Sequence, residues 1–551
     1  MAQREQLSMG TLADGSADGL GPRRWWVLAV MSVGALIIFI DNTVVNTALP
    51  RISLDLGAST STLQWVIDSY VLLLAGMLLL AGSVGDRFGR RRWMAVGLVI
   101  FGAGAAGAAL ATTSSFLIAM RGVQGLGAAF VLPATLSIVT DVFPRRERAK
   151  AIGIWTGVGA LAIGVGPALG GYLVTHVGWS AVFWLHVPIV LAALVGLVIV
   201  PESRDERNLG LDVPGAVLGT AGVTSLVYGI IQGSDSGWTS PEILGSFALA
   251  VTLMLAFTWV ELRTTHPMLP LQFFRQRDFT GAVLVIGLIV FAMLSAFFSL
   301  TQFLQLVQGR SAFQAGLLII SAAAGMMAGA PTAGIVVRAI GPKYLAVTGI
   351  VSMTIGMILL TRLQIDGGML QVIAPLALFG FGGGLVLAPL TDTVMAAVPV
   401  EDAGVGSAVN DVSRELGGAL GVAVIGTVVN GLYSNGVTDS LSGSAPPRLV
   451  DAAREGIGGA VVASTEVAGR SVESFLDATR SAFVEAISSG FRISAGILAA
   501  TLLVAVVLLP RRMRAAQAGF EAEEGLERVV TEGTVVFETA DAELGPEEDV
   551  A

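Results

Sequence analysis

The chain has 551 residues, of which 54% are hydrophobic and only 13% are charged. Soluble proteins carry about 25% charged residues, so most of this chain must face lipid or other apolar helices. This composition excludes a secreted enzyme, a soluble multidomain enzyme and a nucleic-acid-binding protein. Cysteine is absent and the three histidines, His176, His186 and His266, are far apart in the sequence. We therefore expect no disulfide framework and no metal site.

Fourteen apolar stretches are long enough to span a bilayer, which takes about 20 residues each. In chain order they lie at about 25–49, 62–82, 93–112, 115–138, 149–174, 180–201, 211–231, 241–261, 279–305, 312–337, 343–363, 369–397, 404–430 and 488–510. The first stretch is longer than the apolar core of a signal peptide, about 7–15 residues, so we expect it to remain. The sequence predicts an all-α polytopic membrane protein.

The distribution of Arg and Lys predicts the orientation of these spans, because cytoplasmic loops carry the excess of positive charge. With the N-terminus inside, the short outer loops hold only Arg51, Arg310 and Arg362. An even number of spans then places both termini in the cytoplasm. Arg outnumbers Lys thirty to two, which together with abundant Ala, Gly and Val suggests a GC-rich bacterium. We expect a multi-pass protein of the bacterial cytoplasmic membrane.

The chain repeats itself at an offset of about 252–256 residues. The segment 82–91 matches 334–343, and 127–133 matches 383–389, at corresponding places among the spans. The repeat predicts an N-terminal six-helix half (25–201), two additional helices (202–262) and a C-terminal six-helix half (263–510). Internal symmetry of this kind is typical of secondary transporters, whose substrate site lies between the halves near mid-membrane.

Three segments are predicted to lie outside the membrane. Residues 1–24 form a cytoplasmic N-terminal segment, and 431–487 form a long outer loop that is either a cap or a ligand-binding element. This loop ends in an amphipathic helical pattern that leads into the last span. Residues 511–551 form a cytoplasmic tail; from 515 on, it carries eleven acids and one Arg, and we expect it to be disordered.

Four motifs occur in order at four of the spans. They are Gly82–Arg92 (G-x-x-x-D-R-x-G-R-R-R), Asp41–Pro50 (D-N-T-V-V-N-T-A-L-P), Arg121–Gly127 (R-G-V-Q-G-L-G) and the glycine-rich run 157–171. Together they resemble the major facilitator superfamily, specifically its fourteen-helix drug:proton antiporter group, the QacA/EmrB-like proteins. The resemblance covers about residues 25–510. It implies the major facilitator fold and proton-coupled export by alternating access between the two halves.

The resemblance also implies roles for two of these motifs. The superfamily's signature loop corresponds to Gly82, Asp86, Arg87, Gly89, Arg90 and Arg91. We interpret it as a gate in which Asp86 caps a neighbouring helix and the Arg residues hold the cytoplasmic side shut, although anchoring by positive charge explains the Arg run equally well. The fifth-helix antiporter motif, associated with exporters, corresponds to Gly166, Pro167, Gly170 and Gly171, and it indicates either a moving helix or a static kink. In the segment 178–188, Ser180 and His186 replace the family's usual Arg and Asn.

Ionisable residues within membrane spans suggest function, because each costs about 2.5–3.5 kcal/mol to insert. At about 1.5 Å per residue, Asp41, Asp68 and Arg121 lie at similar depth in the outer part of the first, second and fourth spans. One interpretation is a proton relay in which Arg121 moves relative to Asp41 or Asp68. The alternatives are a buried ion pair that locks two helices and an Arg that holds backbone carbonyls.

A second charged set lies in the C-terminal half. Asp392 is near the inner end of the twelfth span, and Asp411, Arg414 and Glu415 lie in the thirteenth. Asp411 and Glu415 share a helix face because they are four residues apart. In the group that this sequence resembles, such acids recognise cationic substrates or couple protons. A salt bridge within the helix near the inner gate remains an alternative.

The leading functional hypothesis is a proton-driven exporter of amphipathic, hydrophobic or cationic small molecules. We expect no cofactor besides the proton gradient, no nucleic-acid partner, and a monomer whose partners are its substrates, protons and the lipid bilayer. The alternative is an exporter of an endogenous lipid or secondary metabolite, including antibiotic self-resistance. Neither H-E-x-x-H, G-x-S-x-G nor the ATP-binding G-x-x-x-x-G-K-[ST] pattern occurs, so the chain is not expected to be an enzyme or an ATP-driven pump.

Overall fold

The computed structural model describes residues 21–204, 210–265, 267–398, 403–442, 445–466 and 471–510. Every regular element within these ranges is a helix, and fourteen of the helical segments are long and apolar enough to cross a membrane. The predicted all-helical class and the predicted number of spans are therefore confirmed. The predicted disordered tail, 511–551, and most of the predicted N-terminal segment lie outside the described residues.

The N-terminal half contains six spans. They are α2 (Arg23–Leu56), α3 (Thr60–Phe88), α4 (Arg90–Ala109), α5 (Ser114–Val142), α6 (Arg145–His176) and a divided sixth span made of α7 (Ser180–Trp184), α8 (His186–Gly196) and the 3-10 turn η2 (Leu197–Ile199). The sixth span divides at Leu185, next to His186. Pro188 explains the division, because it has no backbone N–H to donate to the Trp184 carbonyl one turn earlier.

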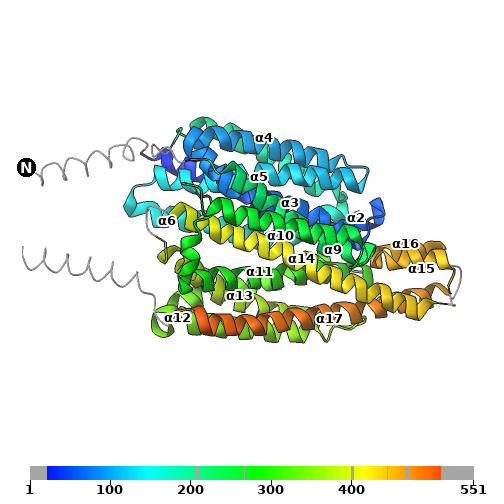
Figure 1. Cartoon of the computed structure of the whole chain (residues 1–551). Helices are drawn as coiled ribbons and strands as arrows, with labels where there is room; N and C mark the ends of the chain where they lie inside the picture. The colour runs from blue at the N-terminus through cyan, green and yellow to red at the C-terminus, as the bar shows by residue number, and fades with distance from the viewer. Residues whose placement is uncertain are drawn as a thin grey trace, which may run out of the picture.

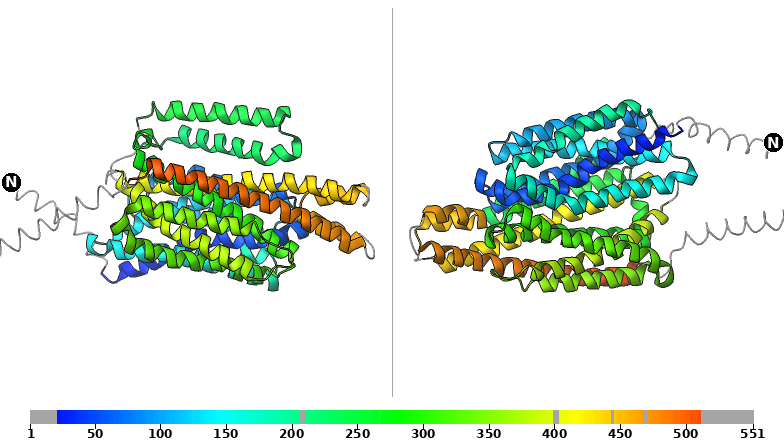
Figure 2. Two further views of the ribbon diagram at one scale, coloured as in Figure 1. Left: turned by 90° about the horizontal axis from the view of Figure 1, so that it is seen from below. Right: turned by 180° about the vertical axis from the view of Figure 1, so that it is seen from behind.

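Helices α9 (Val213–Ser236) and α10 (Pro241–Glu261) form a hairpin between the two halves in the sequence. Figure 2 shows this green pair at one side of the bundle. Asp212 and Ser240 cap the two helices by accepting backbone N–H bonds from Gly215 and Ile243. α9 packs against both α3 and α14, whereas α10 packs mainly against α9. The hairpin is thus attached along the boundary of the two halves.

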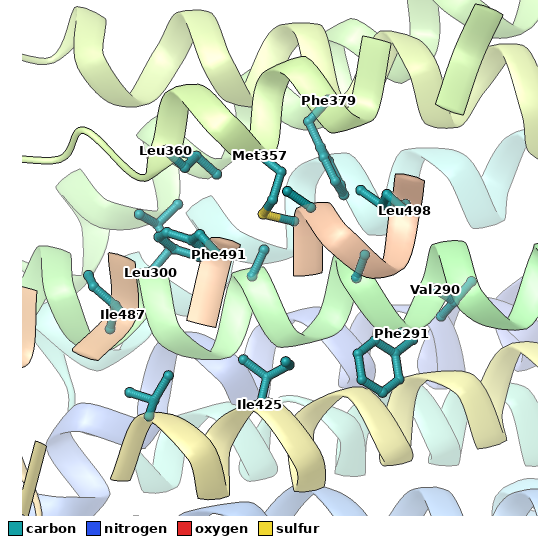
Figure 3. Packing of buried hydrophobic residues seen from close by; sticks show 14 of the residues in the cluster. Val290, Phe291, Leu300, Met357, Leu360, Phe379, Ile425, Ile487, Phe491 and Leu498 are labelled. Atoms are coloured by element: carbon teal, nitrogen blue, oxygen red, sulfur yellow. The ribbon is translucent and has the colours of Figure 1, made fainter. Parts of the chain in front are cut away.

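The C-terminal half begins with the 3-10 turn η3 (Leu271–Arg275). Its spans are formed by α11 (Arg277–Gln302) with the π-helical turn η4 (Phe303–Val307), α12 (Ala312–Leu360), α13 (Leu370–Ala396), α14 (Ala403–Leu441) and α17 (Ser471–Leu508). α12 supplies two spans, which meet at Gly341, where φ is +82°. Apolar side chains from α11, α12, α13, α14 and α17 interdigitate in the core of this half (Figure 3).

Within the predicted outer segment 431–487, the amphipathic helix expected at its end forms the first part of α17, and α14 also extends into the segment. α14 continues to Leu441 and α17 already begins at Ser471, so both ends of the predicted loop are helical. α14 has 39 residues, about 58 Å, which is nearly twice the apolar thickness of a bilayer. The two extensions persist because they bury apolar residues against each other; the rings of Tyr433 and Phe483, for example, meet edge to face at 5.7 Å.

Two short helices complete this outer extension. They are α15 (Pro447–Arg454) and α16 (Ile457–Ala463), followed by the 3-10 turn η6 (Ser464–Glu466). We call 445–466 the cap. The described chain begins and ends at the opposite end of the bundle, at the start of α2 and the end of α17 (Figure 1). We call that end the inner end and the end that carries the cap the outer end.

Candidate functional site

The two halves are joined near their outer end. The Nε2 of Gln64 on α3 donates to the carbonyls of Val422 and Ala423 on α14, both at 2.9 Å. Three further hydrogen bonds cross the boundary toward the outer end: Gln305 Nε2 to the Thr47 carbonyl at 3.0 Å, the Phe313 N–H to Thr175 Oγ1 at 3.1 Å, and the Thr60 N–H to the Glu455 carbonyl at 3.0 Å. Side-chain ion pairs at the inner end, among the described residues, stay within one half. This conformation is therefore closed on the outer side.

A cavity of about 600 Å³ lies between the halves. Its lining comes from α2 and α6 on one side and from α11, α12 and α13 on the other. The lining is mostly apolar, with Met293, Phe297, Met326, Met353 and Phe379 as its largest side chains. Thr43, Asn46, Thr47 and Thr301 supply its polar part. Flexible Met and aromatic rings suit bulky apolar molecules of varied shape.

A second cavity of about 310 Å³ lies beside the first, and Asn46 lines both. This smaller cavity carries the charge. Asp41 and Arg121 line it from the N-terminal half, and Leu294 and Val422 line it from the C-terminal half. An apolar cavity therefore lies next to a cavity that is lined by ionisable side chains.

Asp41 and Arg121 form an ion pair that is almost completely buried. Nη1 of Arg121 lies 2.9 Å from Oδ1 and 2.8 Å from Oδ2 of Asp41, and the two side chains, Arg121 and Asp41, are 2% and 0% exposed. The pair joins α2 to α5. Because neither charge reaches water, removing one partner would leave an uncompensated buried charge.

Arg121 is also held by neutral groups. Its Nε donates to the Val66 carbonyl at 3.0 Å, Nη1 donates to Oε1 of Gln124 at 3.0 Å, and the guanidinium lies 4.3 Å from the centre of the Tyr70 ring. The two alternatives foreseen for Arg121, pairing with a carboxylate and holding a carbonyl, therefore occur together. Gln124 belongs to the motif Arg121–Gly127, whereas the sequence does not show that Tyr70 contacts Arg121.

His186 is a third ionisable group beside Asp41. Its Nε2 is 3.6 Å from Oδ1 of Asp41, its side chain is fully buried, and its ring meets Phe101 edge to face at 5.5 Å. The sequence shows His186 only as a departure from the family motif. Periodicity gives no indication that this position faces the first helix.

Asp68 lies apart from the predicted cluster. It is fully buried on α3, and neither carboxylate oxygen has a hydrogen-bond partner. It is one turn from Gln64, on the helix face that meets α14. The structure thus brings Asp41 and Arg121 together and leaves Asp68 separate. A buried carboxyl group without a partner remains a candidate for binding a proton, because an isolated charge there is costly.

The charged set of the C-terminal half is spread over two helices. Asp392 is exposed on α13. Asp411 accepts a hydrogen bond from Asn410 at 3.2 Å, and Arg414 interacts electrostatically with both Asp411 and Glu415 on α14. Glu415 also interacts electrostatically with Asp41 across the boundary. Of this set, Glu415 is therefore the residue linked to the buried ion pair.

The predicted gating loop connects α3 to α4 at the inner end. Arg90 pairs with Asp86, Nε to Oδ1 at 2.6 Å, and also with Asp141 at the end of α5. The Arg91 N–H donates to Oε1 of Glu202 at 3.0 Å. Asp86 thus pairs with Arg90 in this conformation, and no contact of Asp86 with a neighbouring helix start is found among the described residues.

Three further residues of the predicted gating loop, Gly82, Arg87 and Gly89, differ in how closely they are packed. Gly89 has φ +116°, and a Cβ there would lie 2.8 Å from Oε1 of Glu202. Gly82 lies beside Pro133, and the exposed Arg87 lies over the Phe88 ring.

The glycines of the antiporter motif lie where α6 meets its neighbours most closely. A Cβ on Gly166 would lie 1.9 Å from Oγ1 of Thr43, and one on Gly170 would lie 2.5 Å from Oγ1 of Thr47. Both contacts are with α2, the helix that carries Asp41. On the other face, a Cβ on Gly171 would lie 2.3 Å from a carbonyl oxygen of α12 in the opposite half.

Pro167 also faces that opposite half. Its carbonyl oxygen is only 2.1 Å from where a Cβ on Gly316 would stand. The small residues on both helices let α6 and α12 approach closely across the boundary.

Residues 31–422 match the Major Facilitator Superfamily. The chain belongs to this superfamily. It is 33% identical over 506 residues to the tetracenomycin C resistance and export protein of Streptomyces glaucescens, covering 90% of this chain and 93% of that protein. It is 33% identical to the multidrug efflux pump LfrA of Mycolicibacterium smegmatis (88% and 96% covered) and 35% identical to the multidrug resistance protein Stp of Mycobacterium tuberculosis (73% and 75% covered). The chain is a transporter and not an enzyme.

Solved structures support the same fold. The inward-facing, unoccupied bacterial homolog of the human lysosomal transporter Spinster superposes with a TM-score of 0.57 at 18% identity, covering 90% of this chain and all of that one. A D-xylose–proton symporter gives 0.55 at 14% identity, covering 88% and 98%. These likenesses establish the fold of this superfamily member.

Proposed function

We propose that this chain is a proton-driven exporter of amphipathic, hydrophobic or cationic small molecules, with its inner end in the bacterial cytoplasm. The observation that carries the proposal is the Asp41–Arg121 pair, fully buried yet on the wall of a cavity between the halves. A purely structural ion pair has no need of such a cavity. A proton-coupling site requires such a cavity, because protons must reach it.

The mechanism follows from the geometry of that pair. Arg121 occupies both oxygens of Asp41, so a proton binds there only when Arg121 moves away. Motion of one half against the other changes the electrostatic interaction of Asp41 with Glu415, since these residues belong to different halves. Protonation of Asp41 and rearrangement of the boundary are then linked steps. Asp68 is a further candidate for proton binding on the helix that packs against α14.

The cavities indicate the class of substrate. The larger cavity presents Met and Phe side chains to an apolar body, and the smaller one presents a carboxylate that attracts a cation. An amphipathic cation would place its apolar body in the larger cavity and direct its charge toward the smaller one, with Asn46 lining both. A neutral apolar molecule fits the larger compartment alone. In both cases the substrate enters from the inner end and leaves when the outer contacts open.

Export of a secondary metabolite, including self-resistance, is the second candidate. It is supported by the likeness to the tetracenomycin C resistance and export protein and to the puromycin resistance protein of Streptomyces alboniger, which is 34% identical over 82% of this chain. The apolar lining of the larger cavity also suits a polycyclic antibiotic. Export of such compounds uses the same coupling site and differs only in substrate.

Transport in everted membrane vesicles tests the proposal. A fluorescent lipophilic cation should accumulate when a proton gradient is imposed, and a protonophore should abolish the signal. Asp41→Asn should abolish it too, whereas Asp55→Asn, an exposed acid on the same helix, should not. A protonophore-insensitive signal would disprove proton coupling. Unchanged transport by Asp41→Asn would show that the ion pair is structural.

A folding control is needed because Asp41→Asn leaves the Arg121 charge buried, which costs about 3–5 kcal/mol. The double variant Asp41→Asn with Arg121→Gln removes both charges and should restore the amount of folded protein. It should not restore proton-coupled transport. Recovery of transport in the double variant would contradict a coupling role for Asp41.

A further inference from the structure

His186 is a buried titratable group that the Asp41–Arg121 ion pair does not require, because Arg121 already binds both carboxylate oxygens of Asp41. Its Nε2 stands 3.6 Å from Oδ1 of Asp41, just beyond hydrogen-bonding distance, and neither ring nitrogen makes a hydrogen bond of normal geometry. A fully buried polar side chain without a partner is uncommon. This unsatisfied state indicates that His186 finds its partners in another step of the cycle.

Complete burial and the neighbouring Arg121 disfavour the protonated form of His186, whereas Asp41 favours it, so movement of Arg121 away from the ring would favour protonation. A charged imidazole donates from both nitrogens. Asp41 faces one side of the ring, and the backbone carbonyls of Val182 and Phe183, which belong to the preceding helix α7, act on it as acceptors. An imidazolium that closes the gap of 3.6 Å would satisfy both donors and leave Asp41 with a counter-ion.

The division of the sixth span allows that small movement. His186 is the first residue of α8, and the helix is interrupted at Leu185. Because Pro188 gives no N–H to the Trp184 carbonyl, this turn lacks one helical hydrogen bond. A shift of the start of α8 by a fraction of an ångström would change the distance between His186 and Asp41.

His186 borders neither of the two cavities, and Asp41 is the cavity-lining carboxylate next to it. Asp41 and Arg121 line the smaller cavity, whereas His186 is absent from the lining of both cavities and has no exposed surface. The charged groups that act on its ring are Asp41 from α2 and Arg121 from α5; α4 presents the apolar ring of Phe101. Asp41 is therefore placed to receive a proton from the cavity first.

We propose that His186 is the second proton carrier of the coupling site, and that it receives its proton from Asp41 once Arg121 has moved away. In this step the O–H bond of the Asp41 carboxyl breaks and an N–H bond forms at Nε2 of His186. The product is an Asp41 carboxylate paired with a His186 imidazolium, which replaces the original pair with Arg121. This inference rests on the proposed proton coupling and specifies where the proton is held.

Nitrogen NMR of the histidine rings tests the proposal directly. The chain contains three histidines, so protein labelled with ¹⁵N-histidine in lipid nanodiscs gives few signals, and His186→Asn assigns the relevant one. On acidification from about pH 8 to about pH 5, the range in which imidazole normally titrates, the His186 signal should change to that of imidazolium. In Asp41→Asn the signal should stay neutral. In Arg121→Gln the imidazolium fraction at a given acidic pH should increase.

Transport assays supply the second readout. His186→Asn, which installs the residue usual in the family, should keep substrate binding within about threefold while the pH dependence of transport changes. His176→Asn is the matched control, because His176 is exposed and stacks on Tyr172 outside the site; it should change neither property.

Four results would overturn the inference. A His186 ring that stays neutral in the wild type, or that titrates identically in Asp41→Asn, would show that it holds no proton from Asp41. A His186→Asn variant with an unchanged pH profile would lead to the same conclusion, and proton coupling through Asp41 would still stand. Wild-type transport that is insensitive to a protonophore would overturn the proposed function and this inference with it.

Discussion

The side-chain amide of Gln64 donates to the backbone carbonyl of Val422 at 2.9 Å and so joins the two halves of the transporter. Gln64 is 1% exposed, and its amide also reaches the carbonyl of Ala423 and Oγ1 of Thr427. One side chain from α3 thus engages three acceptors on α14. These contacts lie toward the outer end, so they must break whenever the transporter opens outward.

Gln64→Leu should favour the outward-open conformation. The variant removes hydrogen bonds worth about 1–2 kcal/mol in total, which raises the outward-open fraction roughly 5- to 30-fold. The chain has no cysteine, so a single Ala323→Cys in the larger cavity reports access. Labelling by an impermeant maleimide from outside should be faster in Gln64→Leu. Equal labelling rates would show that Gln64 does not hold the outer side closed.

Gly171→Ala should reduce transport by preventing full closure of the outer side. Its new methyl group would stand 2.3 Å from the carbonyl oxygen of Ala312 in the opposite half, and that backbone atom cannot move independently. We expect transport to fall at least tenfold. Gly157→Ala is the control on the same helix, because a Cβ there meets nothing within 4 Å. Wild-type rates in Gly171→Ala would contradict the tight fit of α6 against α12.

Arg90→Gln should destabilise the inner end of the N-terminal half. Arg90 is the shared partner of Asp86 and Asp141, and its side chain is only 13% exposed. Loss of this network should cost about 1 kcal/mol, the upper end for partly exposed ion pairs, and lower the melting temperature of purified protein. Arg87→Gln should leave it unchanged, because Arg87 is exposed and contacts mainly the Phe88 ring. Similar melting temperatures for both variants would contradict a structural role for the network.

Glu415→Gln should weaken export of cations more than export of neutral compounds. Glu415 interacts electrostatically with Asp41 of the other half, so it contributes negative potential near the boundary between the halves. We expect a fivefold or greater loss of transport for a dication, with a neutral apolar substrate affected less than twofold, in competition assays with vesicles. Asp392→Asn serves as the control, because Asp392 is exposed on α13. An equal loss for both substrates would indicate a role in proton coupling instead of cation recognition.

Much of the fold follows from the sequence alone. The lengths of the apolar runs predict the fourteen spans. The repeat between 82–91 and 334–343 predicts the two halves, because both features can be recognised in the sequence without tertiary contacts. The amphipathic pattern at the end of the outer segment 431–487 predicts the start of α17, whereas hydropathy does not show that the extension of α14 packs against it. Tyr433 and Phe483 supply that packing, and their contact depends on the tertiary structure.

The candidate site was predictable only in part. Counting residues from the membrane surface places Asp41, Asp68 and Arg121 at the same depth, but depth does not tell which way a side chain points around its helix. Asp41 meets Arg121, whereas Asp68 faces α14. For the same reason the sequence does not show that Arg121 lies over the ring of Tyr70, 4.3 Å from its centre.

The cap is carried by the two longest outer extensions, α14 and α17, and rests on the opposite half at Thr60 and Ser53. It therefore works as a lever arm: a small tilt of the C-terminal half becomes a larger displacement at its tip than anywhere inside the bilayer. A small rearrangement at the membrane centre therefore produces a larger displacement of the cap away from Thr60 and Ser53. A pair of spectroscopic probes on the cap and on the α2–α3 turn would follow each turnover at the outer end without touching the cavity.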